Sequence, residues 1–417
     1  MKQMADSKKY QKKREQKKRK KLVHAVELAL SVIVAVGAGV AVAVTATIYL
    51  ASIMSVTFQN VTPPTIPKTI LTQKPSREHR APEAPLDGKL EVSASSAPIF
   101  SYAHAVVEAD GRFFIGMADY ANNTFSPNEI VIMSDPSDLS KYSLVSLPKK
   151  GEIDTIVYDE NNDKVYLELS GNGSLDLYAI DPHTYRVTTI ISTTTIDAGR
   201  RPAIVTDGSY IYGITETNPS TVFKVGIKDG SLVTSSVGHV AFGHSAAITV
   251  NGSSTEIYFG GGRSNGFEKM RASDLVVLGK VDVSPCFISD DMPLRDIGGS
   301  DSYVYLGCEL SPYGKAVRTS DMSVKSFPLP GYSYGLFIHG DKLWNVAEDA
   351  AIDVFSGFDL SAGKRLAIME EGERMKLSGQ NIAVNELLFS TTTDSLYFTG
   401  WWDLRGLFKV SGLSGIR

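Results

Sequence analysis

Short runs of alternating apolar and polar residues, separated by turns rich in Asp, Asn, Gly and Ser, fill the chain from residue 103 to residue 411. Alternation of this kind is typical of half-buried β-strands. The three- to four-residue period of an amphipathic helix does not recur in this region. The pattern therefore predicts an all-β fold.

The strand-like runs form seven repeats, each with an aromatic residue near the centre of one run. The aromatics follow one another at intervals of 52, 46, 46, 47, 39 and 53 residues: Phe114, Tyr166, Tyr212, Tyr258, Tyr305, Trp344 and Tyr397. An Asp-centred turn follows each of the first six: Asp138, Asp181, Asp229, Asp274, Asp321 and Asp359. A period of about 40–50 residues filled by short strands fits one four-stranded propeller blade. Seven repeats predict a seven-bladed β-propeller whose aromatics pack between blades.

The last repeat is one strand short. A full repeat should supply strands a to d from the channel outward, as in the second repeat with 154–159, 163–169, 175–181 and 185–191. After residues 406–411, the expected strand c of the last repeat, the chain has no further strand-like run. Because an unpaired sheet edge is a liability, we expect residues 89–94 to supply the outer strand of the last blade and close the ring.

The second repeat resembles a known family. Residues 164–190, KVYLELSGNGSLDLYAIDPHTYRVTTI, are similar to the YVTN-type repeat of the quinoprotein-like seven-bladed β-propeller superfamily, in which a hydrophobic-Tyr-hydrophobic strand leads to a hydrophobic-Asp-x-x-Thr hairpin. The other repeats share the spacing but not the residue types of this motif. Leu343-Trp344-Asn345 departs from its hydrophobic-Tyr-hydrophobic pattern. The resemblance implies the fold, and it transfers no function because this superfamily hosts enzymes, receptors and scaffolds.

The first 87 residues have a different composition. Residues 1–21 hold eleven Lys and Arg against two acids, and residues 28–54 contain no charged residue. About 20 apolar residues suffice to cross a bilayer, and basic segments stay on the cytoplasmic side. The sequence predicts a cytoplasmic segment at 1–21, a transmembrane helix at 22–54, a Pro-rich stalk at 55–87 and an external propeller domain at 88–417. The net charge of −4 leaves the external part acidic.

Three alternatives concern this N-terminal region. Ala41-Val42-Ala43 could be a signal-peptide cleavage site, but the apolar stretch is longer than the usual 7–15 residues. Beside a membrane span, the basic block is expected to touch anionic lipid rather than nucleic acid. Gly37 and Ala41 form a small-xxx-small pair that could support a homodimer of helices.

The predicted ring has a definite orientation. If residues 89–94 form an outer strand d, the stalk reaches the bottom face, and the top face, made by b–c and d–a loops, points away from the membrane. We expect a ligand-binding surface there, with candidates in the last b–c loop and at the channel mouth: Trp401, Trp402, Asp403, Arg405, Arg200, Arg201 and Arg295. Trp beside Arg is typical of binding hot spots, although the tryptophans could instead pack inside the blade and the arginines could pair with channel carboxylates.

Signals for enzyme chemistry are weak. His239 and His244 lie in one d–a connection without a visible third ligand, so no metal and no cofactor are predicted. The Ser-x-Asp boxes of propeller sialidases and a nucleophilic Ser elbow are not found. A lactonase-like calcium site remains an alternative, with carboxylate and amide candidates near inner strands at Asp154, Asp296, Asn385 and Glu386.

Two covalent modifications suit an external domain. Cys286 and Cys308, the two cysteines, should lie near the top of adjacent blades, where they could form a disulfide or remain buried thiols. Sequons for N-glycosylation begin at Asn60, Asn122, Asn172 and Asn251.

The sequence favours a single-pass protein of a cell membrane or viral envelope, whose propeller binds an external protein or glycan in adhesion or attachment. An extracytoplasmic hydrolase of the lactonase or glycosidase kind is the alternative, and a structural subunit of a surface or virion assembly is the third.

Overall fold

The structure is a computed structural model in which the described residues are 88–94, 103–118, 128–135, 138–170, 173–199, 202–251, 254–261, 265–286, 288, 292, 294–297, 301–308, 311–329, 333–339, 342–347, 351–356, 365–367, 382–390, 392–402, 406–411 and 413. All of them belong to one compact unit, Arg80–Arg417. The predicted segments 1–21, 22–54 and 55–87, with Gly37, Ala41 and Asn60, lie outside the described residues. Within the described ranges, no helix has the length and apolar character needed to span a membrane.

The described strands form six four-stranded sheets and one five-stranded sheet. We number the sheets along the chain by their innermost strands. Sheet 1 contains β3 (Ala103–Ala109), β4 (Arg112–Met117), β5 (Glu129–Met133) and β6 (Ser143–Ser146). Sheet 2 contains β7 (Glu152–Asp159), β8 (Lys164–Ser170), β9 (Leu175–Ile180) and β10 (Val187–Thr193). Sheet 3 contains β11 (Ala203–Thr206), β12 (Tyr210–Ile214), β13 (Thr221–Gly226) and β14 (Leu232–Ser236).

The second half of the chain continues the series. Sheet 4 contains β15 (Gly243–Asn251), β16 (Ser254–Gly261), β17 (Gly266–Arg271) and β18 (Val276–Asp282). Sheet 5 contains β19 (Leu294–Ile297), β20 (Asp301–Leu306), β21 (Tyr313–Arg318) and β22 (Val324–Pro328). Sheet 6 contains β23 (Ser333–His339), β24 (Lys342–Ala347), β25 (Ala351–Ser356), β26 (Arg365–Ala367) and β1 (Gly88–Lys89). Sheet 7 contains β27 (Ile382–Ser390), β28 (Ser395–Trp402), β29 (Gly406–Ser411) and β2 (Glu91–Ala94).

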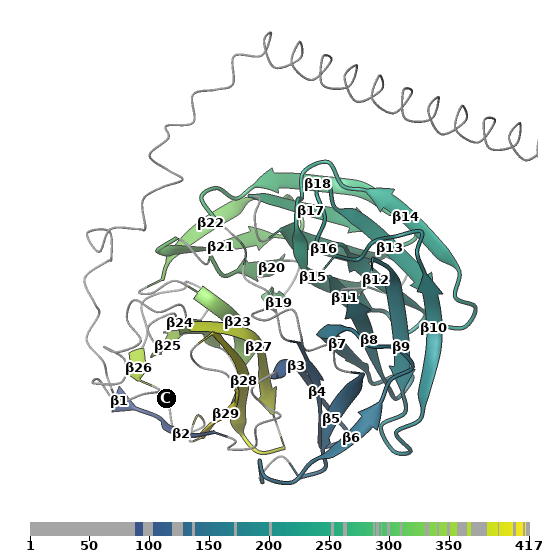
Figure 1. Cartoon of the computed structure of the whole chain (residues 1–417). Helices are drawn as coiled ribbons and strands as arrows, with labels where there is room; N and C mark the ends of the chain where they lie inside the picture. The colour runs from purple at the N-terminus through teal and green to yellow at the C-terminus, as the bar shows by residue number, and fades with distance from the viewer. Residues whose placement is uncertain are drawn as a thin grey trace, which may run out of the picture. The chain divides into compact units, whose positions relative to one another are not determined.

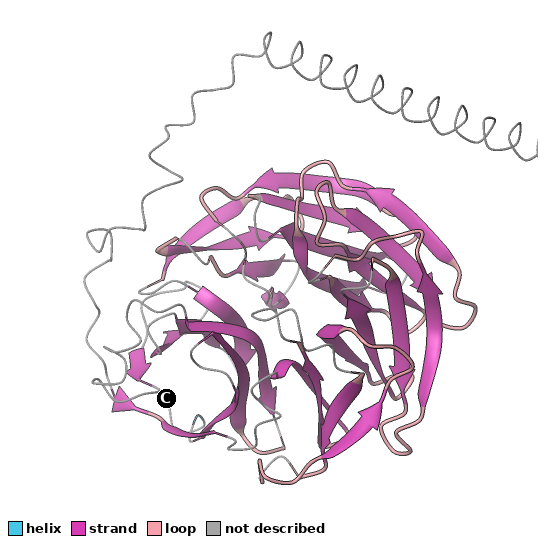
Figure 2. Ribbon diagram, viewed as in Figure 1, coloured by secondary structure: helices cyan, strands magenta, loops and turns pink. Residues whose placement is uncertain are grey.

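The sheets stand around a common centre like the blades of a propeller, with the first strand of each nearest the centre (Figure 1). Strands make up the described regular structure, and the hairpins run from the centre outward (Figure 2). Neighbouring inner strands contact one another, as β3 does with β7 and with β27. The all-β propeller predicted from the repeats is therefore confirmed as a fold.

The predicted Asp turns close the hairpins between the third and fourth strands. In each described case the carboxylate accepts a backbone N–H two residues ahead, at Asp138, Asp181, Asp229, Asp274 and Asp321. Several of these turns place a residue at positive φ, including Tyr185, Leu275 and Met322. Aspartate recurs here because its short side chain can cap a turn locally. Asp359 lies outside the described residues.

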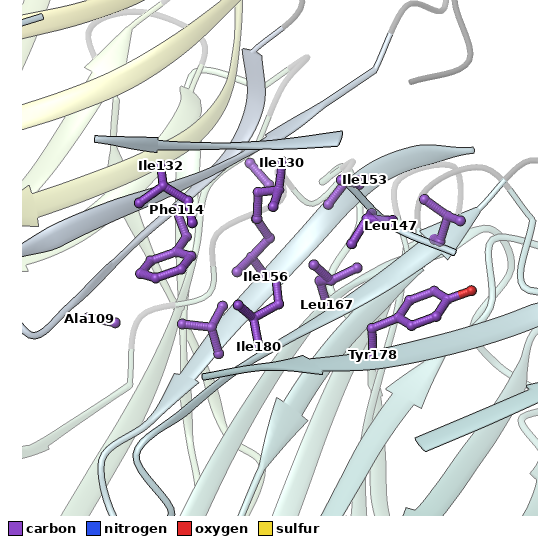
Figure 3. Packing of buried hydrophobic residues seen from close by; sticks show 13 residues of the cluster. Ala109, Phe114, Ile130, Ile132, Leu147, Ile153, Ile156, Leu167, Tyr178 and Ile180 are labelled. Atoms are coloured by element: carbon purple, nitrogen blue, oxygen red, sulfur yellow. The ribbon is translucent and has the colours of Figure 1, made fainter. Parts of the chain in front are cut away.

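The recurring aromatics are buried between sheets, as predicted. Each of the seven is at most 3% exposed. Each lies in a hydrophobic cluster that also contains residues of the next sheet. Figure 3 shows the first of these interfaces, where Phe114 and Ile132 of sheet 1 lie beside Ile156 and Leu167 of sheet 2. Burying a large apolar side chain contributes about 1.5–3 kcal/mol, so these contacts hold the ring together.

The N-terminal segment closes the ring in a more elaborate way than predicted. Strand β2 pairs antiparallel with β29, with Glu91 opposite Ser411 and Ala94 opposite Phe408. This confirms the predicted closure for residues 91–94. Assigning residues 89–94 to one strand was wrong, because β1 pairs in parallel with β26 and is the fifth strand of sheet 6. Leu90, between β1 and β2, is buried in the cluster that joins sheets 6 and 7, so the segment fastens two sheets.

Candidate functional site

Five of the innermost strands contain a β-bulge near their first residues. The register shifts lie between Ala103 and Ala105, Glu152 and Thr155, Gly243 and Ser245, Ser333 and Gly335, and Val384 and Glu386. The residues at these bulges are His104, Ile153 with Asp154, His244, Tyr334 and Asn385. Bulges re-aim side chains and are frequent beside functional sites. The bulged strands are all innermost strands, and the bulges lie near their first residues. We therefore take the end of the ring at which the innermost strands start as the candidate site and call it the bulge face.

A buried polar chain connects three sheets at the bulge face. His104 Nδ1 and Asp154 Oδ1 lie 2.9 Å apart, with side chains 5% and 2% exposed. Ser170 Oγ donates a hydrogen bond of 2.8 Å to Asp154 Oδ2. From the other side, Thr399 Oγ1 donates to the His104 carbonyl at 2.7 Å. Sheets 7, 1 and 2 are thus joined by polar contacts where the ring closes.

Two further carboxylates lie close to this chain and differ in their surroundings. Asp176 accepts hydrogen bonds from Lys149 Nζ and Ser174 Oγ at 2.8 and 2.7 Å. Burial by itself would raise the pKa of Asp176, but hydrogen bonds from Lys149, Ser192 and Ser174 outweigh burial and lower it. Glu168 is fully buried, and within the described part of the chain neither carboxylate oxygen has a hydrogen-bond partner. Burial, reinforced by repulsion from Asp154, Asp176 and Asp197, raises the pKa of Glu168 well above its ordinary value.

The geometry of this cluster suits support rather than catalysis. The Ser170 hydroxyl donates to Asp154, whereas a nucleophilic serine needs its hydroxyl bonded to the histidine. Asp154 and His104 are also buried from solvent. Among the residues that the structure describes, no group of three or more His, Cys, Asp or Glu could hold a metal ion. What the cluster does is fix the bulged ends of β3 and β7 in place.

The structure places the predicted tryptophans differently from the sequence. Trp401 and Trp402 are the last residues of β28, opposite Ala383 and Ile382. Their assignment to the b–c loop was wrong, because the ladder between β27 and β28 continues past the bulge at Val384. Asp403 and Arg405 lie outside the described residues.

The predicted basic and metal-binding candidates are not brought together within the described ranges. Arg295 lies in β19 opposite Tyr303, and Arg200 and Arg201 lie outside the described residues. His244 lies in β15 rather than in the connection, and the His239 backbone N–H donates to Glu268 Oε1 at 2.9 Å. Of the calcium-site candidates, Asp154 is in the polar chain, whereas Asp296 is in β19 and Asn385 and Glu386 are in β27.

Cys286 and Cys308 form a disulfide in the structure, with Cα atoms 4.9 Å apart. Cys286 follows β18 and Cys308 follows β20, so the bond links sheets 4 and 5. Ile288 forms an isolated bridge with Cys308 beside it. The sequon residue Asn251 ends β15 opposite Ser254, and Asn122 and Asn172 lie outside the described residues.

Sequence reasoning missed His104, Glu168, Ser170 and Lys149. One signal was available, since Glu168 interrupts the apolar run Val165–Leu169 where a buried strand was expected. The bulges gave no such signal, because register is a property of paired strands.

The comparisons with known proteins concern the fold alone. No protein-family model matches the chain, and no curated protein matches it. Among solved structures, a chain of the "Crystal Structure of Mitotic Checkpoint Complex" is similar, with a TM-score of 0.58 and 10% sequence identity over 80% of this chain and 96% of that chain. This likeness supports the β-propeller fold, while the YVTN-type resemblance stays a prediction.

Proposed function

We propose that this chain is a membrane-anchored surface protein that binds an external protein partner through the bulge face of a seven-bladed ring. Each sheet is one blade in this proposal, with the five-stranded sheet 6 as the sixth. A glycan is the other ligand class to be tested.

We choose the bulge face because its residues differ from sheet to sheet. The repeated features, namely the buried aromatics and the Asp turns, build the interfaces and hairpins and are alike around the ring. At the bulge face, by contrast, equivalent positions hold different residues, including His244, Tyr334 and Asn385. Binding surfaces on repeat scaffolds are made from such variable positions on a constant frame.

The proposed anchoring rests on the N-terminal sequence and the chain direction. Residues 28–54 are uncharged and follow the basic segment 1–21, which favours a cytoplasmic N-terminus. Strand β2 begins at Glu91, opposite Ser411 at the end of β29. Since β29 ends at the side away from the bulge face, β2 begins on that side, which favours a bulge face left for an external partner.

Anchoring is tested with the full chain expressed in cells. We expect the protein to stay with membranes after alkaline extraction and the ring to be digested by protease added outside intact cells. Release by alkaline extraction, or protection of the ring, would contradict the anchored orientation.

Binding is tested by probing arrays of extracellular proteins and of glycans with fragment 80–417, which covers the compact unit. Binding to a protein should fall at least about tenfold in Tyr334→Ala or Trp402→Ala. The matched control is Lys228→Ala, which changes an exposed residue at the opposite end of the ring and should leave binding unchanged. Equal losses in all variants would refute the assignment of the bulge face, and binding to glycans alone would replace the protein partner.

A further inference from the structure

Glu168 occupies an unusual environment for a carboxylate. It lies in the middle of β8, opposite Thr155 on one side and Leu177 on the other. Leu177 packs with Ile204 of sheet 3. Residues directly opposite each other on paired strands share one face of the sheet, so Glu168, like Leu177, faces the interface between sheets 2 and 3. Its side chain is 0% exposed, and both carboxylate oxygens lack a hydrogen-bond partner among the residues that the structure describes.

The charged groups around Glu168 give an ionised carboxylate little support. The nearby acids are Asp154 on β7, Asp176 on β9 and Asp197 in the connection that leads to β11. Among the described residues, the two basic groups of the cluster contact other carboxylates, since Lys149 lies 2.8 Å from Asp176 and His104 lies 2.9 Å from Asp154. A buried charge without a partner is strongly unfavourable. The neutral acid is therefore the form that this interface accommodates.

We propose that Glu168 holds a proton in the closed ring and acts as a proton-dependent lock: the contact of sheet 2 with sheet 3 is tight in mildly acidic solution and loosens when the proton is lost. Sheet 2 also contains the bulged start of β7, whose Asp154 lies 2.9 Å from His104 of β3, so loosening reaches the bulge face.

The direction of the effect follows from proton binding. In the unfolded chain Glu168 loses its proton near the ordinary pKa of 4.5, whereas burial keeps it protonated to higher pH in the folded chain. Between these two values the unfolded state binds fewer protons than the folded state, so stability decreases as the pH rises. Above the folded pKa the full cost of ionising the buried group is present.

The test compares the full chain in mild detergent with Glu168→Gln, which keeps the shape without the titration, from pH 5 to pH 8. The melting temperature of the variant relative to the wild type should rise with pH by about 2 °C or more. Using the difference between the two proteins removes the contribution of the titrating groups that do not interact with Glu168. The matched control, Glu160→Gln, changes an exposed carboxylate of the same sheet and should track the wild type at every pH.

A local measurement separates the lock from a general effect. Amide exchange, corrected for its intrinsic pH dependence, should show protection of β8 and β9 falling between pH 5 and pH 8 relative to β21 of sheet 5, in the wild type and not in Glu168→Gln. Infrared difference spectra of the wild type should contain a protonated carboxylic acid band that the variant lacks.

If Glu168→Gln does not fold, Glu168→Leu, which needs no hydrogen-bond partner, takes its place in the same measurements. A melting difference that is constant from pH 5 to pH 8, or the absence of the carboxylic acid band at pH 5, would overturn the proposal.

Discussion

A lysine beside the recurring aromatic explains how single residues tie one sheet to the next. Lys224 lies opposite Tyr212, and its Nζ lies 4.0 Å above the centre of the Tyr210 ring. The same nitrogen donates to the carbonyls of Ala272 and Ser273 in the Asp turn of sheet 4, at 3.0 Å each. Sheet 4 repeats the arrangement, with Lys269 opposite Tyr258 and donating to Thr319 of sheet 5 at 2.7 Å.

Replacing Lys224 by Met should therefore destabilise the ring, although no charged partner of Lys224 is found among the described residues. The aliphatic stem is kept, whereas two charge-assisted hydrogen bonds and the cation–π contact disappear, for an expected loss of about 2 kcal/mol in the free energy of unfolding measured in urea. Lys228→Met, which changes an exposed lysine of the next turn, should stay within about 0.5 kcal/mol. Equal effects of the two substitutions would contradict this account of Lys224.

At the scale of the element, the segment formed by β1 and β2 closes the ring. Its four-residue ladder with β29 covers an edge that would otherwise be open, and Leu90 fills the space between sheets 6 and 7 beside Trp344 and Phe408. Because backbone hydrogen bonds hold both halves of the segment, its side chains need to match the core at few positions, chiefly Leu90 and the partly buried Val92.

Leu90→Ala should cost about 2–4 kcal/mol, since it removes a buried side chain from a closed cluster. Ser93→Ala, an exposed position of β2, should change stability by less than about 0.5 kcal/mol. Thermal unfolding of both variants measures the difference. If Leu90→Ala melts with the wild type, the segment does not fasten the ring.

At the scale of the whole molecule, the Asp turns recur around the end of the ring opposite the bulge face. Hydrogen bonds from Ser140, followed by one from Lys141, lower the pKa of Asp138 to about 2. Backbone and side-chain hydrogen bonds likewise lower the pKa of Asp181, Asp229 and Asp321. These groups stabilise the fold above the unfolded pKa of 3.8, and their contribution is lost as the pH falls through the folded values.

The melting temperature should accordingly decrease as the pH is lowered from 5 to 2. The double variant Asp181→Asn with Asp321→Asn keeps side chains that can close the turns, and the slope of stability against pH should decrease, by at most about one proton for each residue replaced. Glu160→Gln, outside these turns, serves as the control. An unchanged slope in the double variant would show that the turn aspartates do not govern acid unfolding.

Much of the fold could be predicted because its determinants are local and repeated. Alternation gave the strands of the second repeat to within about two residues, and the Asp turns and buried aromatics are where the spacing placed them. The candidate site was less predictable. Asp154 was among the residues considered, but its partners His104 and Ser170 come from another sheet and another strand, and Trp401 and Trp402 were assigned to a loop because the extension of β28 depends on pairing with β27.

The sequence by itself determined the propeller, because one period of apolar and turn residues recurs around the chain, and it determined that the missing outer strand of the last repeat comes from the N-terminal side. Only the tertiary structure decided that this segment divides between sheets 6 and 7, that five inner strands have a bulge near their first residues, and that Glu168 is buried with no hydrogen-bond partner among the described residues. These features depend on register and on contacts between sheets, and such contacts join residues whose separation along the chain carries no signal of their proximity.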